Sequence, residues 1–281
     1  MKVAYLGPAA TFTHEAALKR FGNEADLRPM RSIADVFMAV EAGEAEFGLV
    51  PIENSLEGAV TYTLDMFGQP DLDDIVIVAE VLLPISHHLM MAEGGKLDDI
   101  KLLYSHPQSI GQCRGWLRTN LPEVEIQEVA SNARAAELVG HQPGIAAIAP
   151  RLCATNYGLQ ILASDIQDAD FNQTRFFVIY KQRPRWPLPV FEDAEEGQPI
   201  TALMISIKDR VGTLHAVTGV FTRYQLNMNR IESRPSKQKA WDYVFFIDFV
   251  GQPSQPHVAA ALRELATETT WAKVLGSWIR S

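Results

Sequence analysis

Four short segments carry polar side chains where apolar strands give way to turns or helices. They read GPAATFTHEA (7–16), PIENSLEG (51–58), SHPQSIGQC (105–113) and NQTRFFVI (172–179). Hydroxyl and amide groups at such places could bind an anion together with the free N–H groups of a helix start. They could equally be ordinary helix caps, so each segment taken alone allows two interpretations.

The first two segments leave that choice open. The hydroxyls of Thr11 and Thr13 would form an anion pocket beside a helix start, or would simply cap the helix. Asn54 and Ser55 either cap a helix that follows them or face a cleft.

The third segment is more informative. Pro107 suits the first turn of a helix, so Ser105 or His106 is expected to cap that helix. Gln108 and Gln112 are four residues apart and therefore lie on one helix face. Two amides and a hydroxyl that converge on one place would suit recognition of a carboxylate or a hydroxyl group.

The fourth segment reads as the start of a buried strand. Strand alternation puts Thr174 and Phe176 on one face and Arg175 on the other. If Thr174 points into a cleft, Arg175 would do so only where the strand is still irregular. Arg175 is therefore either a ligand contact or a member of a structural ion pair.

The elements that must position these side chains alternate between short apolar strands and amphipathic helices over residues 1–165. The clearest helix, SIADVFMAVEAG (32–43), has Ser32 and Asp35 at its start and Gly43 at its end. Such alternation predicts an α/β fold with a largely parallel sheet, whose ligands bind beyond the carboxyl ends of the strands. All four polar segments lie at junctions of this kind.

The chain changes character after residue 182. Residues 183–199 are rich in proline and acidic side chains and are expected to form a linker. Residues 200–281 read β-α-β-β-α-β, which is the ferredoxin-like order.

Composition excludes several classes of protein. A formal charge of −9 argues against a nucleic-acid partner, and no apolar run is long enough to cross a membrane. Cys113 and Cys153 offer neither a disulfide framework nor metal-ligand spacing, so both are expected to be reduced packing residues. The first residues form a strand and leave no room for a signal peptide, which predicts a cytoplasmic protein.

Taken together and in this order, the four segments resemble the prephenate dehydratase family. The segment GTLHAVTGVFTRYQLNMNRIESRP (212–235) resembles the ACT regulatory domain that accompanies that catalytic domain. The resemblance implies a catalytic domain of two α/β lobes, similar to type II periplasmic binding proteins, over residues 1–182. One lobe would comprise residues 1–79 with 166–182 and the other residues 80–165, followed by the ferredoxin-like ACT domain at 200–281.

The resemblance also implies an activity and a site. The enzyme would convert prephenate into phenylpyruvate in phenylalanine biosynthesis, without a metal or an organic cofactor. The essential threonine of the family falls on Thr174, and Phe176 would wall the pocket. The polar positions that line the family's cleft fall on Thr11, Asn54, Ser55, Ser105, Gln108 and Gln112, with Arg175 as a further substrate contact if its geometry permits.

The ACT resemblance implies feedback control by phenylalanine and pairing of ACT domains in a homodimer or homotetramer. Its effector motifs fall on Gly212, Thr213 and Leu214, and on Glu232, Ser233, Arg234 and Pro235. The sequence departs from the family's pattern at Ala10, Asn132 and Thr213, and the last of these could alter the affinity or choice of effector.

Two alternatives keep the same fold. The substrate could be arogenate, the aminated relative of prephenate, or the chain could be a non-catalytic two-lobe amino-acid sensor.

In the expected reaction, Thr174 is too weak an acid to deliver a full proton. It would act as a positioned hydrogen-bond donor to the leaving hydroxyl.

Overall fold

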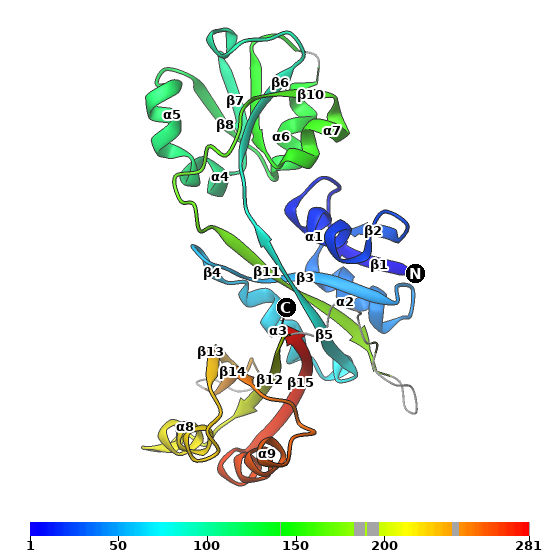
Figure 1. Ribbon diagram of the computed structural model, residues 1–281, viewed down its shortest axis with the longest axis vertical. Helices are drawn as coiled ribbons and strands as arrows, with labels where there is room; N and C mark the ends of the chain where they lie inside the picture. The colour runs from blue at the N-terminus through cyan, green and yellow to red at the C-terminus, as the bar shows by residue number, and fades with distance from the viewer. Residues whose placement is uncertain (141, 183–188, 190–196, 238–241, 281) are drawn as a thin grey trace.

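The computed structural model describes residues 1–140, 142–182, 189, 197–237 and 242–280. The described residues form two α/β lobes and a smaller C-terminal unit, with the first lobe lying between the other two parts (Figure 1). The expected linker, 183–199, lies mostly outside the described residues. The fold class expected from the sequence, two α/β lobes followed by a βαββαβ unit, is confirmed.

The first lobe is a mixed sheet with helices on both faces. Strand β1 is parallel to β2 and β3, whereas β11 runs antiparallel to both β3 and β5. The elements are β1 (Lys2–Leu6), α1 (Phe12–Phe21), β2 (Asp26–Met30), α2 (Ile33–Glu41), β3 (Phe47–Asn54), β4 (Gly58–Ala59), α3 (Thr61–Phe67), the 3-10 turn η1 (Pro70–Leu72), β5 (Ile75–Pro84) and β11 (Gln173–Lys181).

The second lobe has its own sheet, in the order β10-β6-β9-β7-β8. Strand β7 is parallel to β8 and β9, and β6 is antiparallel to β9 and β10. The elements are β6 (His88–Ala92), the 3-10 turn η2 (Leu97–Asp99), β7 (Leu102–Ser105), α4 (Pro107–Gln112), α5 (Arg114–Asn120), β8 (Glu125–Glu128), α6 (Asn132–Val139), β9 (Ile145–Ala149), α7 (Arg151–Tyr157) and β10 (Leu159–Ala163).

The chain crosses between the two lobes twice. Residues 85–87 lead from β5 into β6, and residues 164–172 lead from β10 back into β11. The crossings are hydrogen-bonded to each other, because Ile85 N donates to Asn172 O (2.9 Å) and Ile166 N donates to His87 O (2.9 Å). The start of β11, where Thr174 lies, is therefore next to the connection between the lobes.

The C-terminal unit is an antiparallel sheet in the order β13-β14-β12-β15, with α8 and α9 packed on one face. Its elements are β12 (Gln198–Ser206), α8 (Thr213–Arg223), β13 (Met228–Pro235), β14 (Tyr243–Val250), α9 (Pro256–Glu268) and β15 (Trp271–Arg280).

The strands of the C-terminal unit and of the first lobe form one continuous sheet, joined where β15 meets β5 at Gly276 opposite Ile77. A Cβ on Gly276 would lie 2.0 Å from the carbonyl oxygen of Ile77, so only glycine permits this backbone approach. The apolar core beneath this contact is shared, because it includes α2 and α3 of the first lobe together with Met204, Phe246 and Trp278 of the C-terminal unit.

Three sequence-based expectations need correction. The sheets are mixed rather than largely parallel, because the returning strand β11 and the strands β6 and β10 run antiparallel to their neighbours. No helix begins at Asn54 or Ser55: the short strand β4 pairs back onto β3, and α3 begins only at Thr61. The helix expected to begin near Pro107 ends at Gln112, and a second short helix follows it after Cys113.

Other local expectations hold. Ser32 caps α2 by accepting from Asp35 N (3.1 Å), and Thr11 caps α1. Cys113 and Cys153 are free and buried, and burial raises the pKa of each thiol to about 12, which suits packing residues. None of the described helices is long and apolar enough to cross a membrane.

Candidate active site

A cavity of about 410 Å³ lies between the two lobes. This volume is within the range of small-molecule sites, and the lining comes from both lobes and from the crossing strands. The lining residues are Phe12, Thr13, Pro51, Asn54, Glu57, Gly58, Ala59, Val60, Ile85, His87, His106, Gln108, Ser109, Gln112, Asn132, Thr174 and Phe176. Neither Arg nor Lys is among them.

Thr174 has a hydroxyl group whose direction is set by its neighbour Asn54. The oxygen Oδ1 of Asn54 accepts from the backbone N–H groups of Leu56 (3.0 Å) and Glu57 (3.1 Å). Because backbone N–H groups can only donate, Oδ1 must face them, and Nδ2 must face Thr174. Asn54 Nδ2 lies 2.9 Å from Thr174 Oγ1, so the threonine oxygen accepts there. The hydroxyl hydrogen of Thr174 is then available to a ligand in the cavity.

Asn172 and Gln112 extend this network across the cleft. Asn172 Oδ1 accepts from Asn54 Nδ2 (2.8 Å), and Asn172 Nδ2 donates to Gln112 Oε1 (2.9 Å). Gln112 Nε2 donates to Glu57 Oε1 (3.2 Å). Asn54 and Glu57 belong to the first lobe and Gln112 to the second, so these amides join the two sides of the site.

His87 completes the network and is neutral. Burial lowers the pKa of His87, while the contact between its Nε2 and Gln112 Oε1 (2.8 Å) opposes that effect. Since Gln112 Oε1 is an acceptor, Nε2 of His87 carries the proton. Its other nitrogen, Nδ1, is a buried acceptor with no hydrogen-bond partner among the described residues.

Asn132 organises the wall formed by the second lobe. Its Oδ1 accepts from His106 N (3.1 Å) and its Nδ2 donates to Ser109 Oγ (2.8 Å). The side chain therefore fixes the first turn of α4, where His106 is the N-cap. This explains one of the sequence departures from the family's pattern.

Of the nine residues expected from the sequence to bind substrate or catalyse, five line the cavity and four, Arg175 among them, do not. Thr174, Phe176, Asn54, Gln108 and Gln112 line it. Thr11, Ser55 and Ser105 are not among the lining residues of this cavity, which corrects the expectation that all the hydroxyls face the ligand.

The three hydroxyl residues that do not line the cavity have structural contacts instead. Thr11 caps α1 and donates to Pro8 O (2.9 Å), which leaves Thr13 as the lining hydroxyl of that loop. Ser55 fixes the turn before Thr174 by donating to Phe171 O (3.0 Å) and accepting from Gln173 N (2.9 Å). Ser105 is fully buried beneath the wall and donates to Ile148 O (3.0 Å).

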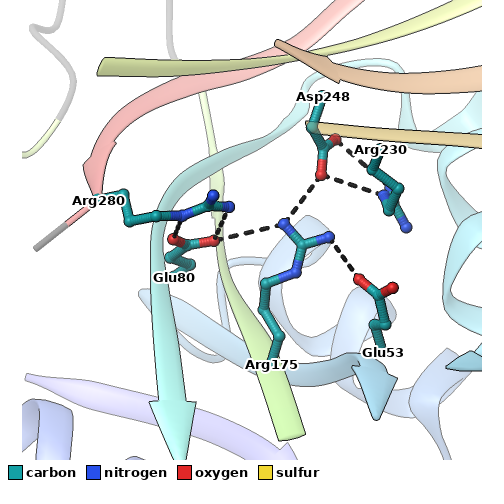
Figure 2. A network of polar contacts seen from close by, with 6 residues as sticks. All are labelled: Glu53, Glu80, Arg175, Arg230, Asp248 and Arg280. Carbon is teal, nitrogen blue, oxygen red and sulfur yellow. Dashed lines mark hydrogen bonds and ion pairs between the residues drawn. The ribbon is translucent and has the colours of Figure 1, made fainter. Parts of the chain in front are cut away.

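Arg175 is not among the lining residues of the cavity. Its side chain points towards Asp248 of the C-terminal unit (Figure 2). Its guanidinium contacts Asp248 (2.9 Å), Glu53 (2.8 Å) and Glu80 (3.5 Å). Burial lowers the pKa of Arg175, but the three carboxylates outweigh burial and the net shift is upward. The expectation of a substrate contact is therefore wrong and the ion-pair alternative is right, because β11 is regular enough for alternation to turn this side chain to the opposite face.

The candidate effector residues lie on two elements of the C-terminal unit. Gly212 is the N-cap of α8 and has a φ of 87°, a conformation that favours glycine. Thr213 is buried and donates to Arg210 O (3.1 Å), whereas Leu214 is exposed. Glu232, Ser233, Arg234 and Pro235 end strand β13. Arg234 contacts Asp65 of the first lobe, at 3.1 Å from each carboxylate oxygen.

Sequence reasoning missed several lining or network residues: Glu57, His87, Ser109, Asn132 and Asn172. Asn172 precedes Thr174 by two residues and could have been found from the same strand-start pattern. His87 gave no signal, since it stands in an apolar run and its partner Gln112 is distant in sequence. Ala10, another departure from the family's pattern, adopts a φ of 64° and is fully buried.

Comparison with known proteins gives two family matches. Residues 3–184 match the prephenate dehydratase family and residues 201–267 match the ACT domain. The bifunctional chorismate mutase/prephenate dehydratase of Aquifex aeolicus is 44% identical over 99% of this chain and 73% of its own length. The prephenate dehydratase of Bacillus subtilis is 35% identical over 99% of this chain and 98% of its own length.

Solved structures give the same fold. Prephenate dehydratase from Arthrobacter aurescens in complex with L-Phe has a TM-score of 0.87 and 32% identity, and the match covers 100% of this chain and 90% of that one. A protein described as a novel type of quorum-quenching acylase has a TM-score of 0.86 and 26% identity, covering 100% and 98%. Since this fold accompanies more than one described activity, the activity has to be argued from the site.

Proposed function

The chain belongs to the prephenate dehydratase family, and from this premise we propose how its cleft converts prephenate into phenylpyruvate. The observation that supports the mechanism is the hydroxyl group of Thr174, which lines the cavity and accepts a hydrogen bond from Asn54. Its hydrogen is thereby directed to a ligand, and the leaving hydroxyl of prephenate needs such a donor.

The reaction breaks two bonds of the substrate ring. The bond to the ring carboxylate breaks and releases carbon dioxide, its electron pair enters the ring, and the carbon–oxygen bond to the hydroxyl breaks. The ring becomes aromatic, and the departing hydroxide takes a proton to become water. Thr174 would donate a hydrogen bond to that oxygen as negative charge develops on it, with the proton itself coming from solvent.

The two carboxylates of prephenate would be bound by neutral groups, because none of the described residues that line the cavity is Arg or Lys. Thr13, Gln108 and Ser109 offer hydroxyl and amide donors on both sides of the cleft. Neutral donors give little long-range attraction, so substrate binding should depend only moderately on salt. Phe176 and Phe12 would supply apolar walls for the ring.

One observation favours arogenate as a second candidate substrate. Glu57 is the only acidic residue among the lining residues, and its carboxylate could pair with the ammonium group that distinguishes arogenate from prephenate. Glu57 also accepts from Gln112, so it already has a role in the network without any ammonium. Turnover of the two substrates by Glu57→Gln distinguishes these roles: a loss confined to arogenate assigns the ammonium contact.

Regulation by phenylalanine belongs to the same proposal. The relative from Arthrobacter aurescens is described in complex with L-Phe, and this chain has the ACT domain at residues 201–267. The effector would bind beside Gly212 and near the end of β13, where a second copy pairs with this one. Strand β13 is the outer strand of its sheet and exposes Ile231, which suits such pairing.

The experiment is phenylpyruvate formation from prephenate by the wild type and by Thr174→Ala. Removal of one preorganised donor should lower kcat by about 10² to 10³, or about 3–4 kcal/mol, with substrate binding retained. Thr174→Ser keeps the hydroxyl and serves as the matched control. Equal kcat in the wild type and Thr174→Ala would refute the donor role, and an inactive wild type would refute the reaction.

A further inference from the structure

Strand β11 presents two different faces to two different parts of the molecule. Thr174 and Phe176 face the cavity between the lobes, whereas Arg175 and Phe177 face the ACT domain. Arg175 is only 8% exposed and follows Thr174 directly in the chain. Any movement of the Arg175 backbone therefore moves the proposed catalytic residue.

The contacts of Arg175 join strands from both domains (Figure 2). Its Nη1 lies 2.9 Å from Asp248 Oδ2 on β14 of the ACT domain, and its Nη2 lies 2.8 Å from Glu53 Oε2 on β3. Glu80, on β5, is 3.5 Å away. One guanidinium thus connects three strands, of which β3 also carries Asn54, the partner of Thr174.

Two further arginines complete the cluster. Arg230 Nε contacts Asp248 Oδ2 (3.1 Å), and Arg280 contacts Glu80 through both oxygens. The cluster contains three arginines and three carboxylates, so its formal charges balance. The side chain of Asp248 is fully buried and that of Glu80 is 4% exposed. Separation of such charges is costly in a buried site, so the cluster should move as a unit rather than loosen gradually.

Packing reinforces the same connection. Arg175 lies over the ring of Phe177, at 5.3 Å from its centroid. Phe177 in turn meets Trp278 of β15 edge to face, at 5.2 Å between centroids. Two successive residues on this face of β11 therefore contact the ACT domain, one by charge and one by aromatic packing.

The pairing of β11 with β3 is irregular beside Arg175, because Ile52 of β3 has no partner on β11. Along the pairing with β3, Thr174 is opposite Asn54 and Arg175 is opposite Glu53, but Phe176 is opposite Pro51. A bulge of this kind disrupts the ladder locally and re-aims the adjacent side chains. Thr174 therefore lies next to a point where a small shift of Arg175 can change its distance to Asn54.

We propose that Arg175 is a positioning residue, and that its pair with Asp248 transmits the state of the ACT domain to Thr174. This inference rests on the proposed function, since it explains how an effector on the ACT domain reaches the cleft. A displacement of β14 moves Asp248, Asp248 carries Arg175 with it, and the bulge converts that movement into a changed direction of the Thr174 hydroxyl.

Other ion pairs between the domains lie away from β11 and serve as controls. Lys273 contacts Asp73 (2.8 Å), and Lys237 contacts Asp65 (2.7 Å). If any contact between the domains could transmit the state of the ACT domain to Thr174, loss of these pairs would reduce inhibition by phenylalanine as much as loss of the pair of Arg175 with Asp248.

The experiment measures kcat, KM, and inhibition by saturating phenylalanine in the wild type, Asp248→Asn, Arg175→Lys and Lys273→Met. Phenylalanine binding is measured separately by calorimetry. In Asp248→Asn we expect a kcat about tenfold lower, a KM within about threefold of wild type, and loss of most of the inhibition although phenylalanine still binds. Arg175→Lys keeps the charge but not the forked geometry, so its inhibition should be intermediate, and Lys273→Met should behave as wild type.

Inhibition decides the outcome. If Asp248→Asn binds phenylalanine and is inhibited as fully as the wild type, the inference is overturned whatever its kcat. If Asp248→Asn fails to bind phenylalanine, inhibition is compared between the wild type and Arg175→Lys, whose substitution lies outside the ACT domain. Full inhibition of Arg175→Lys overturns the inference, and reduced inhibition supports it. A wild type without dehydratase activity would instead refute the proposed function, and an active wild type that phenylalanine does not inhibit would refute the proposed regulation.

Discussion

The two faces of strand β11 differ in the kind of polar group they gather. On the cleft face, neutral amides and hydroxyls surround Thr174, and its hydrogen is left for a ligand. On the opposite face, Arg175 and five other charged residues pair with one another. A site that must stabilise a charge appearing only during reaction needs an uncommitted donor, whereas a junction that must hold its shape needs each charge matched.

Gly276→Ala should have the most severe effect on the junction between the C-terminal unit and the first lobe, where β15 meets β5. Its new Cβ would lie 2.0 Å from the carbonyl oxygen of Ile77, so β15 and β5 would have to separate. We expect a loss of about 3 kcal/mol in the free energy of unfolding, measured by urea denaturation. Gly219→Ala is the matched control: it lies within α8 and should stabilise by about 0.5–1 kcal/mol. Equal stability of Gly276→Ala and wild type would mean that the sheets need not meet there.

Gln112→Leu should disable the cleft without disturbing the junction. The variant loses the acceptor shared by His87 and Asn172 and the donor to Glu57. We expect kcat/KM for prephenate to fall about 30-fold, which corresponds to about 2 kcal/mol. Inhibition by phenylalanine should persist in the remaining activity, and its disappearance would show that the two faces are not separable.

The division of β11 into two faces could be predicted from the sequence, but the partners of the side chains on each face could not. Alternation alone assigned Thr174 and Phe176 to one face and Arg175 to the other, because a strand has a fixed period of two. The partners of Arg175 could not be predicted, since Glu53, Glu80 and Asp248 are brought to it by three different strands. Asn54 was expected near a helix start, but the chain turns at residues 55–57, and β4, which begins at Gly58, pairs back onto β3 instead.

Hydroxyl groups were the least predictable part of the site. Ser105 and Thr11 stand at strand–helix junctions, as ligand-binding hydroxyls often do, yet one is buried beneath the wall and the other caps α1. Thr13, two residues further along, lines the cavity. Which hydroxyl faces the ligand depends on the rotation of a helix, and the sequence pattern does not determine that rotation.

The cleft contains a buried histidine whose protonation should lower stability in mild acid. Burial lowers the pKa of His87 below its ordinary 6.5, so the unfolded chain takes up this proton before the folded one does. The stability associated with neutral His87 is therefore complete above about pH 6.5 and declines as the pH falls towards the lower folded value. The slope from one histidine is at most about 1.4 kcal/mol per pH unit.

His87→Gln isolates this contribution, because His14 and His88 have pKa values lowered in the same direction and remain in both proteins. Urea denaturation between pH 7 and pH 5 should show a shallower loss of stability in the variant than in the wild type. Parallel curves would mean that folding does not lower the pKa of His87.

Lys273→Met should have the smallest effect. Its partner Asp73 has a side chain that is 71% exposed, so the pair is screened by solvent and should contribute less than about 0.5 kcal/mol. A larger loss of stability in urea denaturation would show that pairs at the edge of the junction matter as much as the buried cluster.

The direction of the Thr174 hydroxyl is tested most directly by kcat at saturating prephenate in Asn54→Asp. The carboxylate would keep accepting from Leu56 N and Glu57 N, but it would also accept the hydrogen of Thr174 and withdraw it from the substrate. Asn172→Asp adds the same charge to the network without contacting Thr174. We predict a loss of at least about 10² in kcat for Asn54→Asp and about tenfold for Asn172→Asp. A kcat for Asn54→Asp within about threefold of wild type would contradict the account.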